Sequence, residues 1–252
     1  MEIFSAIQLS DARAVCPEQG DLSRMTVSSA QPCGVARRFI RAGVRNLHIV
    51  DLEGARNGEP WDPNFVEIEA LVQQGNAFIQ VGGGIRTEEH LLRYLRMGVH
   101  RVILGTAAVE NAAFVRRMAS RYGDKIAVSV DVKDGMVVTH GWTKAGGAGA
   151  AELCRRLRDD GIVTVICTDV LRSGMLSGAN MELYRELLTI RGLEIIAAGG
   201  IRSAREIEAL KDMGISGAIL GKAVYDGRLD LGMCLDAADD RRKEEDEEPP
   251  LF

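Results

Sequence analysis

The chain contains one segment twice, and this duplication constrains the fold more than any other feature. Residues 81–106 and 197–222 align without a gap at a constant spacing of 116 residues. Each copy reads as a strand, a glycine turn, a helix, a strand and a second glycine turn. The first turn is Val81-Gly82-Gly83-Gly84-Ile85-Arg86 in one copy and Ala197-Ala198-Gly199-Gly200-Ile201-Arg202 in the other.

Glycines that lie between a strand and a helix let backbone N–H groups approach an anion, which the helix dipole also favours. The duplication therefore predicts two phosphate sites on opposite sides of one symmetric fold, suited to a ligand with a phosphate at each end. The predicted phosphate-binding residues are Gly82, Gly83, Gly84, Gly105 and Thr106 in the first copy and Gly199, Gly200, Gly221 and Lys222 in the second.

Short apolar runs recur along the whole chain and predict eight strands. They lie near residues 3–9, 46–51, 77–82, 101–104, 125–132, 162–168, 193–198 and 217–220. Segments with helical spacing, such as 88–97 and 204–213, lie between most of them. This alternation predicts an α/β fold, a (β/α)8 TIM barrel with a two-fold internal repeat. The alternative is an open doubly wound sheet, which the near-equal halves disfavour.

Length and composition limit the possible functions. The 252 residues suit one barrel domain, expected at 1–238, followed by a charged tail at 239–252. The net charge of −5 argues against nucleic acid as a partner, and no apolar stretch long enough for a membrane span is present. Five scattered cysteines without CxxC spacing indicate a cytoplasmic protein with no disulfides and no metal site. We expect a monomer.

Barrel enzymes bind substrate at the carboxyl ends of their strands, which selects a few polar residues. Asp131 ends the fifth predicted strand, where an unpartnered carboxylate would cost stability, so a functional role is favoured over a structural cap. Asp51 and Asp169 follow equivalent strands and either face the site or anchor their own loops through Asx turns. Arg86 and Arg202 follow the two glycine turns, and one could bind ligand while the other caps a helix.

A set of motifs extends over residues 2 to about 227 of the chain. The motifs are Gln19-Gly20-Asp21, Leu47-His48-Ile49-Val50-Asp51-Leu52-Glu53-Gly54-Ala55, Val81-Gly82-Gly83-Gly84-Ile85-Arg86, Asp131 with Gly141-Trp142, Ile166-Cys167-Thr168-Asp169, and Ala198-Gly199-Gly200-Ile201 with Gly221-Lys222-Ala223. In kind and order they resemble the histidine-biosynthesis family of phosphoribosylformimino-5-aminoimidazole carboxamide ribotide isomerases. The related cyclase subunit of imidazole-glycerol-phosphate synthase shares the duplicated barrel.

The resemblance implies an Amadori rearrangement of an aminoaldose to an aminoketose on a small-molecule substrate with two phosphates, without any cofactor. A general acid helps to open the furanose ring, and a general base then removes the proton at C2. Trp142 would stack on the heterocycle of the substrate; its alternative role is a loop anchor. We assign catalysis to Asp131, Gln8, Thr168 and Asp169, and substrate binding to Asp51, Arg86, Trp142 and Ser173.

The chain departs from the family pattern at three places. Gln8 stands where the family has Asp at the end of the first strand, and an amide cannot take up a proton at neutral pH. Ser173 stands where an acidic residue usually follows the sixth strand, and the first loop has Val15-Cys16-Pro17 in place of Val-Arg-Leu. Three readings therefore remain: an active isomerase that relies on Asp131, an inactive bisphosphate-binding barrel that acts as sensor or scaffold, and an isomerase of a different sugar phosphate.

Overall fold

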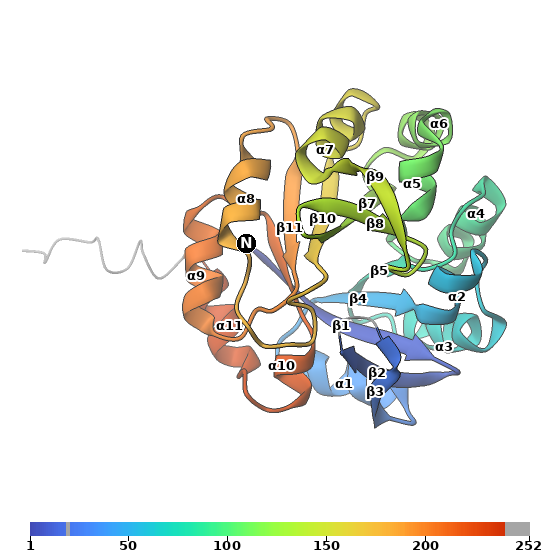
Figure 1. Cartoon of the computed structure of the whole chain (residues 1–252). Coiled ribbons are helices and arrows are strands. Elements are labelled where there is room, and N and C mark those ends of the chain that lie inside the picture. The colour runs from blue at the N-terminus through green and yellow to red at the C-terminus, as the bar shows by residue number, and fades with distance from the viewer. Residues whose placement is uncertain (19–20, 240–252) are drawn as a thin grey trace, which may run out of the picture.

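The protein is a closed barrel of parallel strands surrounded by helices (Figure 1). The computed structural model describes residues 1–18 and 21–239. All neighbouring barrel strands pair in parallel, and the last strand along the chain pairs with the first, which closes the barrel. The predicted (β/α)8 barrel is therefore confirmed, and the open sheet is wrong. In order around the barrel, the strands are β1 (Glu2–Ser10), β4 (Asn46–Asp51), β5 (Phe78–Gly82), β6 (Arg101–Leu104), β7 (Ile126–Lys133), β10 (Thr164–Asp169), β11 (Glu194–Ala198) and β12 (Gly217–Leu220).

Helices cover the outside of the barrel, and the internal repeat extends to their first residues. Thr87 and Ser203 occupy matching positions, and each hydroxyl accepts a hydrogen bond from the backbone N–H three residues on. None of the helices in the described part of the chain is long and apolar enough to cross a membrane. They are α1 (Pro32–Arg41), α2 (Leu52–Asn57), α3 (Asp62–Gln73), α4 (Glu88–Met97), α5 (Thr106–Glu110), α6 (Ala112–Tyr122), α7 (Ala150–Asp159), α8 (Met181–Leu188), α9 (Ala204–Asp212), α10 (Lys222–Tyr225) and α11 (Leu231–Ala238), with a 3-10 turn at Gly123–Lys125.

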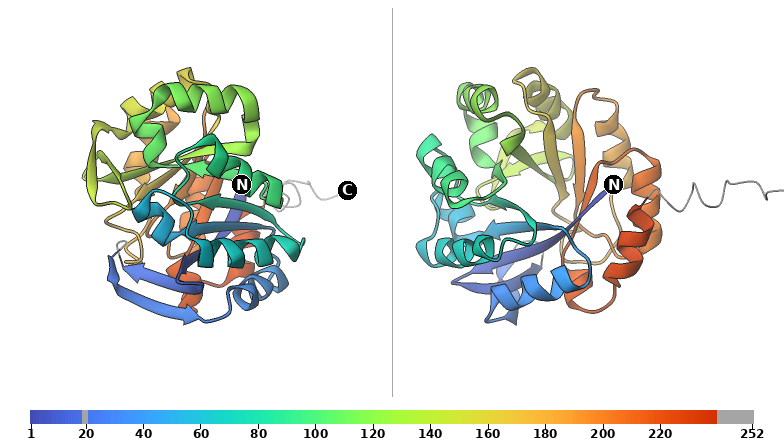
Figure 2. Two further views of the ribbon diagram at one scale, coloured as in Figure 1. Left: turned by 90° about the vertical axis from the view of Figure 1, so that its right-hand side faces the viewer. Right: turned by 180° about the vertical axis from the view of Figure 1, so that it is seen from behind.

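Two antiparallel hairpins are added to the barrel, and the sequence analysis did not predict them. The strands β2 (Arg13–Glu18) and β3 (Asp21–Ser29) follow β1, whereas β8 (Met136–Thr139) and β9 (Lys144–Gly149) follow β7. Since β1 and β7 begin the two halves, the hairpins lie at equivalent points of the repeat. Both extend from the same end of the barrel, away from the N-terminus (Figure 2).

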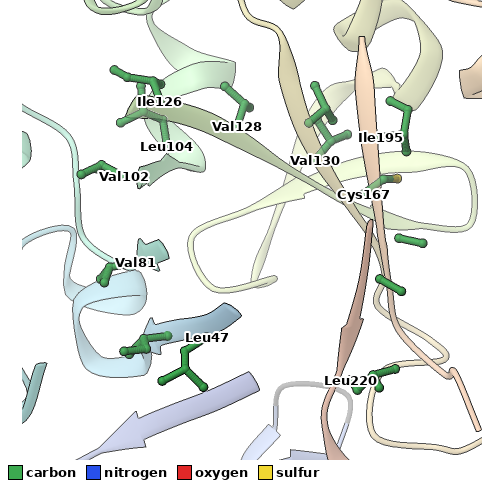
Figure 3. Packing of buried hydrophobic residues seen from close by; sticks show 14 of the residues in the cluster. Leu47, Val81, Val102, Leu104, Ile126, Val128, Val130, Cys167, Ile195 and Leu220 are labelled. Atoms are coloured by element: carbon green, nitrogen blue, oxygen red, sulfur yellow. The ribbon is translucent and has the colours of Figure 1, made fainter. Parts of the chain in front are cut away.

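Side chains alternate along each barrel strand between two apolar layers. Leu47, Val81, Val102, Val128 and Cys167 lie on successive strands and belong to the large core between barrel and helices (Figure 3). Their neighbours in sequence point inward, where a smaller cluster fills the barrel. That inner cluster contains Phe4, Ala6, Ile103, Ala127, Ile166, Ile196, Ala198 and Ile219. The same alternation decides which polar side chains at the strand ends enter the barrel.

The last described helix, α11, ends at Ala238, and the expected tail at 239–252 lies outside the described residues except for Asp239. The Gln19-Gly20 pair of the first motif also lies outside them.

Candidate active site

A cavity opens at the carboxyl ends of the barrel strands, beneath the two hairpins. Residues of the first hairpin, including Cys16, and of the second, including Val138, line its sides. Most of the predicted site residues line it as well: Gln8, Gly82, Gly83, Gly84, Arg86, Gly105, Thr106, Asp131, Trp142, Thr168, Ser173, Gly199, Gly200, Gly221 and Lys222. The structure thus brings together side chains that lie up to 214 positions apart in sequence, from Gln8 to Lys222.

Asp131 is the one acidic side chain among the described residues that line the cavity. Its Oδ1 accepts a hydrogen bond of 2.7 Å from the hydroxyl of Ser129, two residues earlier on the inner face of β7. Burial raises the pKa of the Asp131 carboxyl, and the hydrogen-bonding side chains of Ser129, Trp142 and Thr168 oppose that rise. A raised pKa keeps the acid form of this carboxyl to a higher pH than usual, which suits a group that gives and takes a proton.

Gln8 lies on β1, four strands around the barrel from Asp131 on β7 and therefore on the opposite wall. Its Oε1 is buried and has no hydrogen-bond partner among the described residues. An unpaired buried carbonyl costs free energy, so this amide is suited to a ligand that donates a hydrogen bond to it. It remains unable to accept a proton from carbon.

Asp51 and Asp169 do not enter the cavity, because each ends its strand on the outward side of the alternation. Asp51 Oδ1 accepts from the Gly54 N–H at 2.9 Å and from the Asn64 Nδ2 at 2.7 Å. Asp169 Oδ2 accepts from the Asn180 Nδ2 at 2.7 Å, and its Oδ1 accepts from backbone N–H groups of the following turn. Both carboxylates anchor their own loops, which is the Asx-turn alternative. Ser173 is held beside the cavity by this turn.

The first glycine turn of each copy is shaped by close packing of backbone on backbone. Gly83 and Gly199 have φ angles of +119° and +95°, a region that favours glycine. A Cβ atom on Gly199 would lie 2.5 Å from the carbonyl oxygen of Asp169, and one on Gly83 would overlap that of Asp51. Glycine at these positions thus allows each turn to pack directly against the last residue of the neighbouring strand, Asp51 of β4 or Asp169 of β10, in addition to lining the cavity.

The second glycine turn of each copy precedes a short helix whose first residue lines the cavity. Gly105 precedes α5 and Gly221 precedes α10, each without a side-chain cap. A Cβ on Gly105 would meet nothing within 4 Å. The open approach to uncapped N–H groups is what an oxyanion needs.

The two arginines that follow the glycine turns differ in where their side chains lie. Arg86 lines the cavity, and its guanidinium lies against the αL turn at Gly58. Arg202 does not line it and instead pairs with Glu206 at 3.4 Å, near the start of α9. On the opposite side, the Lys222 Nζ lies 3.1 Å from Glu18 Oε1 of β2. An anion bound beside Gly221 would therefore compete with Glu18 for this ammonium group.

His48 is a cavity residue that the sequence analysis did not assign to the site. It lies on the inner face of β4, and burial lowers its pKa to about 4. The alternation of His48 and Val50 with Leu47 and Ile49 is the signal that could have identified it, because the latter pair forms part of the outer core.

Comparison with known proteins identifies the relatives of this barrel. The family model described as "Histidine biosynthesis protein" matches residues 2–230. The chain belongs to this family. Among curated proteins, it is 42% identical over 238 residues to the 1-(5-phosphoribosyl)-5-((5-phosphoribosylamino)methylideneamino) imidazole-4-carboxamide isomerase of Brachyspira hyodysenteriae, covering 94% of this chain and 99% of the relative. The identically named protein of Campylobacter hominis is 43% identical over 232 residues, covering 92% and 97%.

Family membership confirms the resemblance inferred from the motifs. Among the described residues, no group of three or more His, Cys, Asp or Glu side chains could hold a metal ion.

Proposed function

We propose that the chain is an intramolecular aldose–ketose isomerase of histidine biosynthesis, acting on a ribosyl-aminoimidazole carboxamide with two phosphates. The observation that carries the proposal is a cavity that combines both glycine turns with one buried carboxyl, Asp131, in a chain of this family. The two phosphates would bind at the turns near Gly105 and Gly221, and Trp142 would cover the heterocycle. The distance between the turns would then hold the ribose carbons near Asp131.

With Gln8 on the opposite wall, one carboxyl would carry out both proton transfers. Protonated Asp131 would give its proton to the ring oxygen as the furanose opens, and the resulting carboxylate would take the proton from C2. The raised pKa of the Asp131 carboxyl suits both steps, because the acid form persists closer to neutral pH. Thr168, beside Asp131, would orient it, and Ser173 would contact the substrate.

The second candidate function is a barrel that binds the bisphosphate without turnover, as a sensor or scaffold. Gln8 favours it, since the unpartnered amide can hold a substrate hydroxyl but cannot remove a proton. A monomer in the cytoplasm is part of either proposal, and the five unpaired thiols suit such a reducing compartment.

The test mixes the protein with the aminoaldose bisphosphate and follows the ultraviolet change of a coupled cyclase reaction. Turnover that falls at least about 10²-fold in Asp131→Asn, with binding nearly unchanged, supports the isomerase. Asp134→Asn, in the exposed turn between β7 and β8, is the matched control and should keep the parent rate. Saturable binding without turnover would favour the sensor, and an active Asp131→Asn variant would remove this carboxyl from the mechanism.

A further inference from the structure

One row of polar side chains crosses three neighbouring strands of the barrel. His48 on β4 is the register partner of Gln80 on β5, and Gln80 is the register partner of Arg101 on β6. Gln80 Nε2 lies 3.1 Å from His48 Nδ1, and Arg101 Nη1 donates to Gln80 Oε1 at 3.4 Å. Gln80 is fully buried, whereas His48 and Arg101 at the two ends of the row are half-buried.

The direction of these hydrogen bonds follows from the chemistry of the groups. A guanidinium only donates, so Gln80 must present its carbonyl oxygen to Arg101 and its NH2 group to the imidazole. An NH2 group only donates as well, so His48 Nδ1 must accept and carries no proton. The single proton of a neutral imidazole then resides on Nε2.

Arg101 is itself held in place. Its Nε donates to the carbonyl oxygen of Asp124 at 3.4 Å, and its guanidinium lies over the ring of Phe78 at 5.1 Å from the centroid. Both contacts favour the position of the guanidinium beside Gln80. Burial also disfavours the charged form of His48, whose pKa falls to about 4.

The remaining nitrogen of His48 is turned to the ligand space. His48 lines the cavity, and none of the described residues accepts a hydrogen bond from its Nε2. Its Nε2–H is thus a fixed, uncharged donor on the wall between Gln8 of β1 and the first glycine turn after β5.

We propose that Gln80 and Arg101 are positioning residues that lock His48 as a neutral Nε2–H donor for an acceptor atom of the bound substrate. A neutral donor stabilises developing negative charge on a substrate oxygen or nitrogen without removing protons, so His48 is no general base. The tautomer of His48 does not depend on the proposed function, whereas the contact with substrate rests on that function.

The first test is a long-range 1H–15N spectrum of the full chain labelled with 15N-histidine. The chain has four histidines, and two of them are internal references. His90 Nδ1 lies 3.1 Å from the Gly84 carbonyl oxygen and must carry a proton, whereas His100 Nδ1 accepts from the Ile79 N–H. His48→Gln assigns the signals of His48.

We expect His48 to show the pattern of a neutral ring protonated on Nε2, and to keep it from about pH 8 down to about pH 5. A spectrum of His48 that matches His90, or that shows a charged ring near pH 7, would overturn the proposal without any variant.

The second test changes the residues proposed to fix the tautomer of His48. Gln80→Glu replaces the NH2 donor by a carboxylate acceptor of the same shape, so His48 should move its proton to Nδ1 and titrate at least about one pH unit higher. Arg101→Met leaves Gln80 free to rotate, which should give a mixture of tautomers, and it provides the test if Gln80→Glu does not fold. An unchanged His48 spectrum in both folded variants would contradict the positioning role.

The last readout is binding and turnover of the aminoaldose bisphosphate. His48→Gln can place an amide N–H near the original Nε2–H and should retain more activity than His48→Met. Gln80→Glu should lower kcat more than it raises KM and add a limb to the pH profile near neutral pH. If no variant or parent turns over, the proposed isomerase fails while the spectra still decide the tautomer; equal activity of both His48 variants and the parent would exclude the contact with substrate.

Discussion

At the scale of single residues, the inward and outward alternation of side chains along each strand explains which predicted site residues enter the cavity. Gln8, Asp131 and Thr168 lie on the inner side of the alternation, whereas Asp51 and Asp169 lie on the outer side. This alternation can be read from the sequence, because the apolar Leu47 and Ile49 lie on the same face of the strand as Asp51. What the sequence could not provide is the set of loop contacts, such as those of Asn64 and Asn180, that use up the outer carboxylates.

Gln8→Asp should raise isomerase turnover by about 10²-fold or more, the usual worth of a general base. The substitution places a second carboxylate on the wall opposite Asp131, while the glycine turns that would hold the phosphates stay unchanged. KM should therefore change much less than kcat in the coupled cyclase assay. Gln8→Asn is the matched control, because it has the shape of Asp without its charge.

The gain could be masked by the Ser173 position, so the double variant with Ser173→Asp belongs in the same assay. If neither variant exceeds the parent while both still bind substrate, the missing carboxylate of β1 is not limiting. An isomerase of a different sugar phosphate would then be the better reading.

Asp131→Asn should make the protein more stable at neutral pH. Burial raises the pKa of this carboxyl in the folded state, so the folded protein holds a proton that the unfolded chain releases. The free energy of unfolding therefore falls as pH rises from the ordinary value of about 4 through the raised pKa, and ionised Asp131 destabilises the fold above that window. The amide avoids this cost and can still accept from the Ser129 hydroxyl.

Thermal unfolding measured at several pH values tests this. The Tm of Asp131→Asn should exceed that of the parent near pH 7, and the difference should shrink towards about pH 4. Asp134→Asn should show no such pattern. A difference that grows in acid would contradict the raised pKa.

At the scale of elements, all eight barrel strands could be predicted, because each is a short apolar run and most are separated by segments with helical spacing. The two hairpins were missed. β9 contains Gly146, Gly147 and Gly149, which carry no strand signal, and β2 contains Pro17. The connection from β7 to β8 does have a local signal that the sequence analysis did not use, because Asp134-Gly135 is a two-residue hairpin turn between the register partners Lys133 and Met136.

Gly199→Ala should destabilise the protein much more than Gly214→Ala. Both glycines have a φ of +95°, so the cost of the backbone conformation, about 1–2 kcal/mol, is shared. They differ in their surroundings: a Cβ on Gly199 would lie 2.5 Å from the Asp169 carbonyl oxygen, whereas one on Gly214 would meet nothing within 4 Å. Urea unfolding measures the difference, and equal losses for the two variants would show that the turn after β11 can open without cost.

At the scale of the whole molecule, the duplication places the two glycine turns on opposite walls of one cavity. The turn after β5 and the turn after β11 lie four strands apart in the barrel of eight. The next glycines of the repeat, Gly105 after β6 and Gly221 after β12, precede α5 and α10 at matching positions. The two predicted phosphate sites differ in charge, because Lys222 at the second site already forms an ion pair with Glu18.

We expect inorganic phosphate to bind at two sites per chain, with the site beside Gly221 the weaker because phosphate must displace Glu18 from Lys222. A bisphosphate should bind once per chain and more tightly, because the second phosphate then binds at an effective concentration in the millimolar range. Calorimetric titration gives the stoichiometry, and crystals soaked in sulfate should hold an anion at each turn. Lys222→Gln should weaken one of the two phosphate sites, whereas Lys125→Gln, exposed at the other end of β7, should weaken neither. A single phosphate per chain, or anion density at neither turn, would contradict the symmetric arrangement inferred from the repeat.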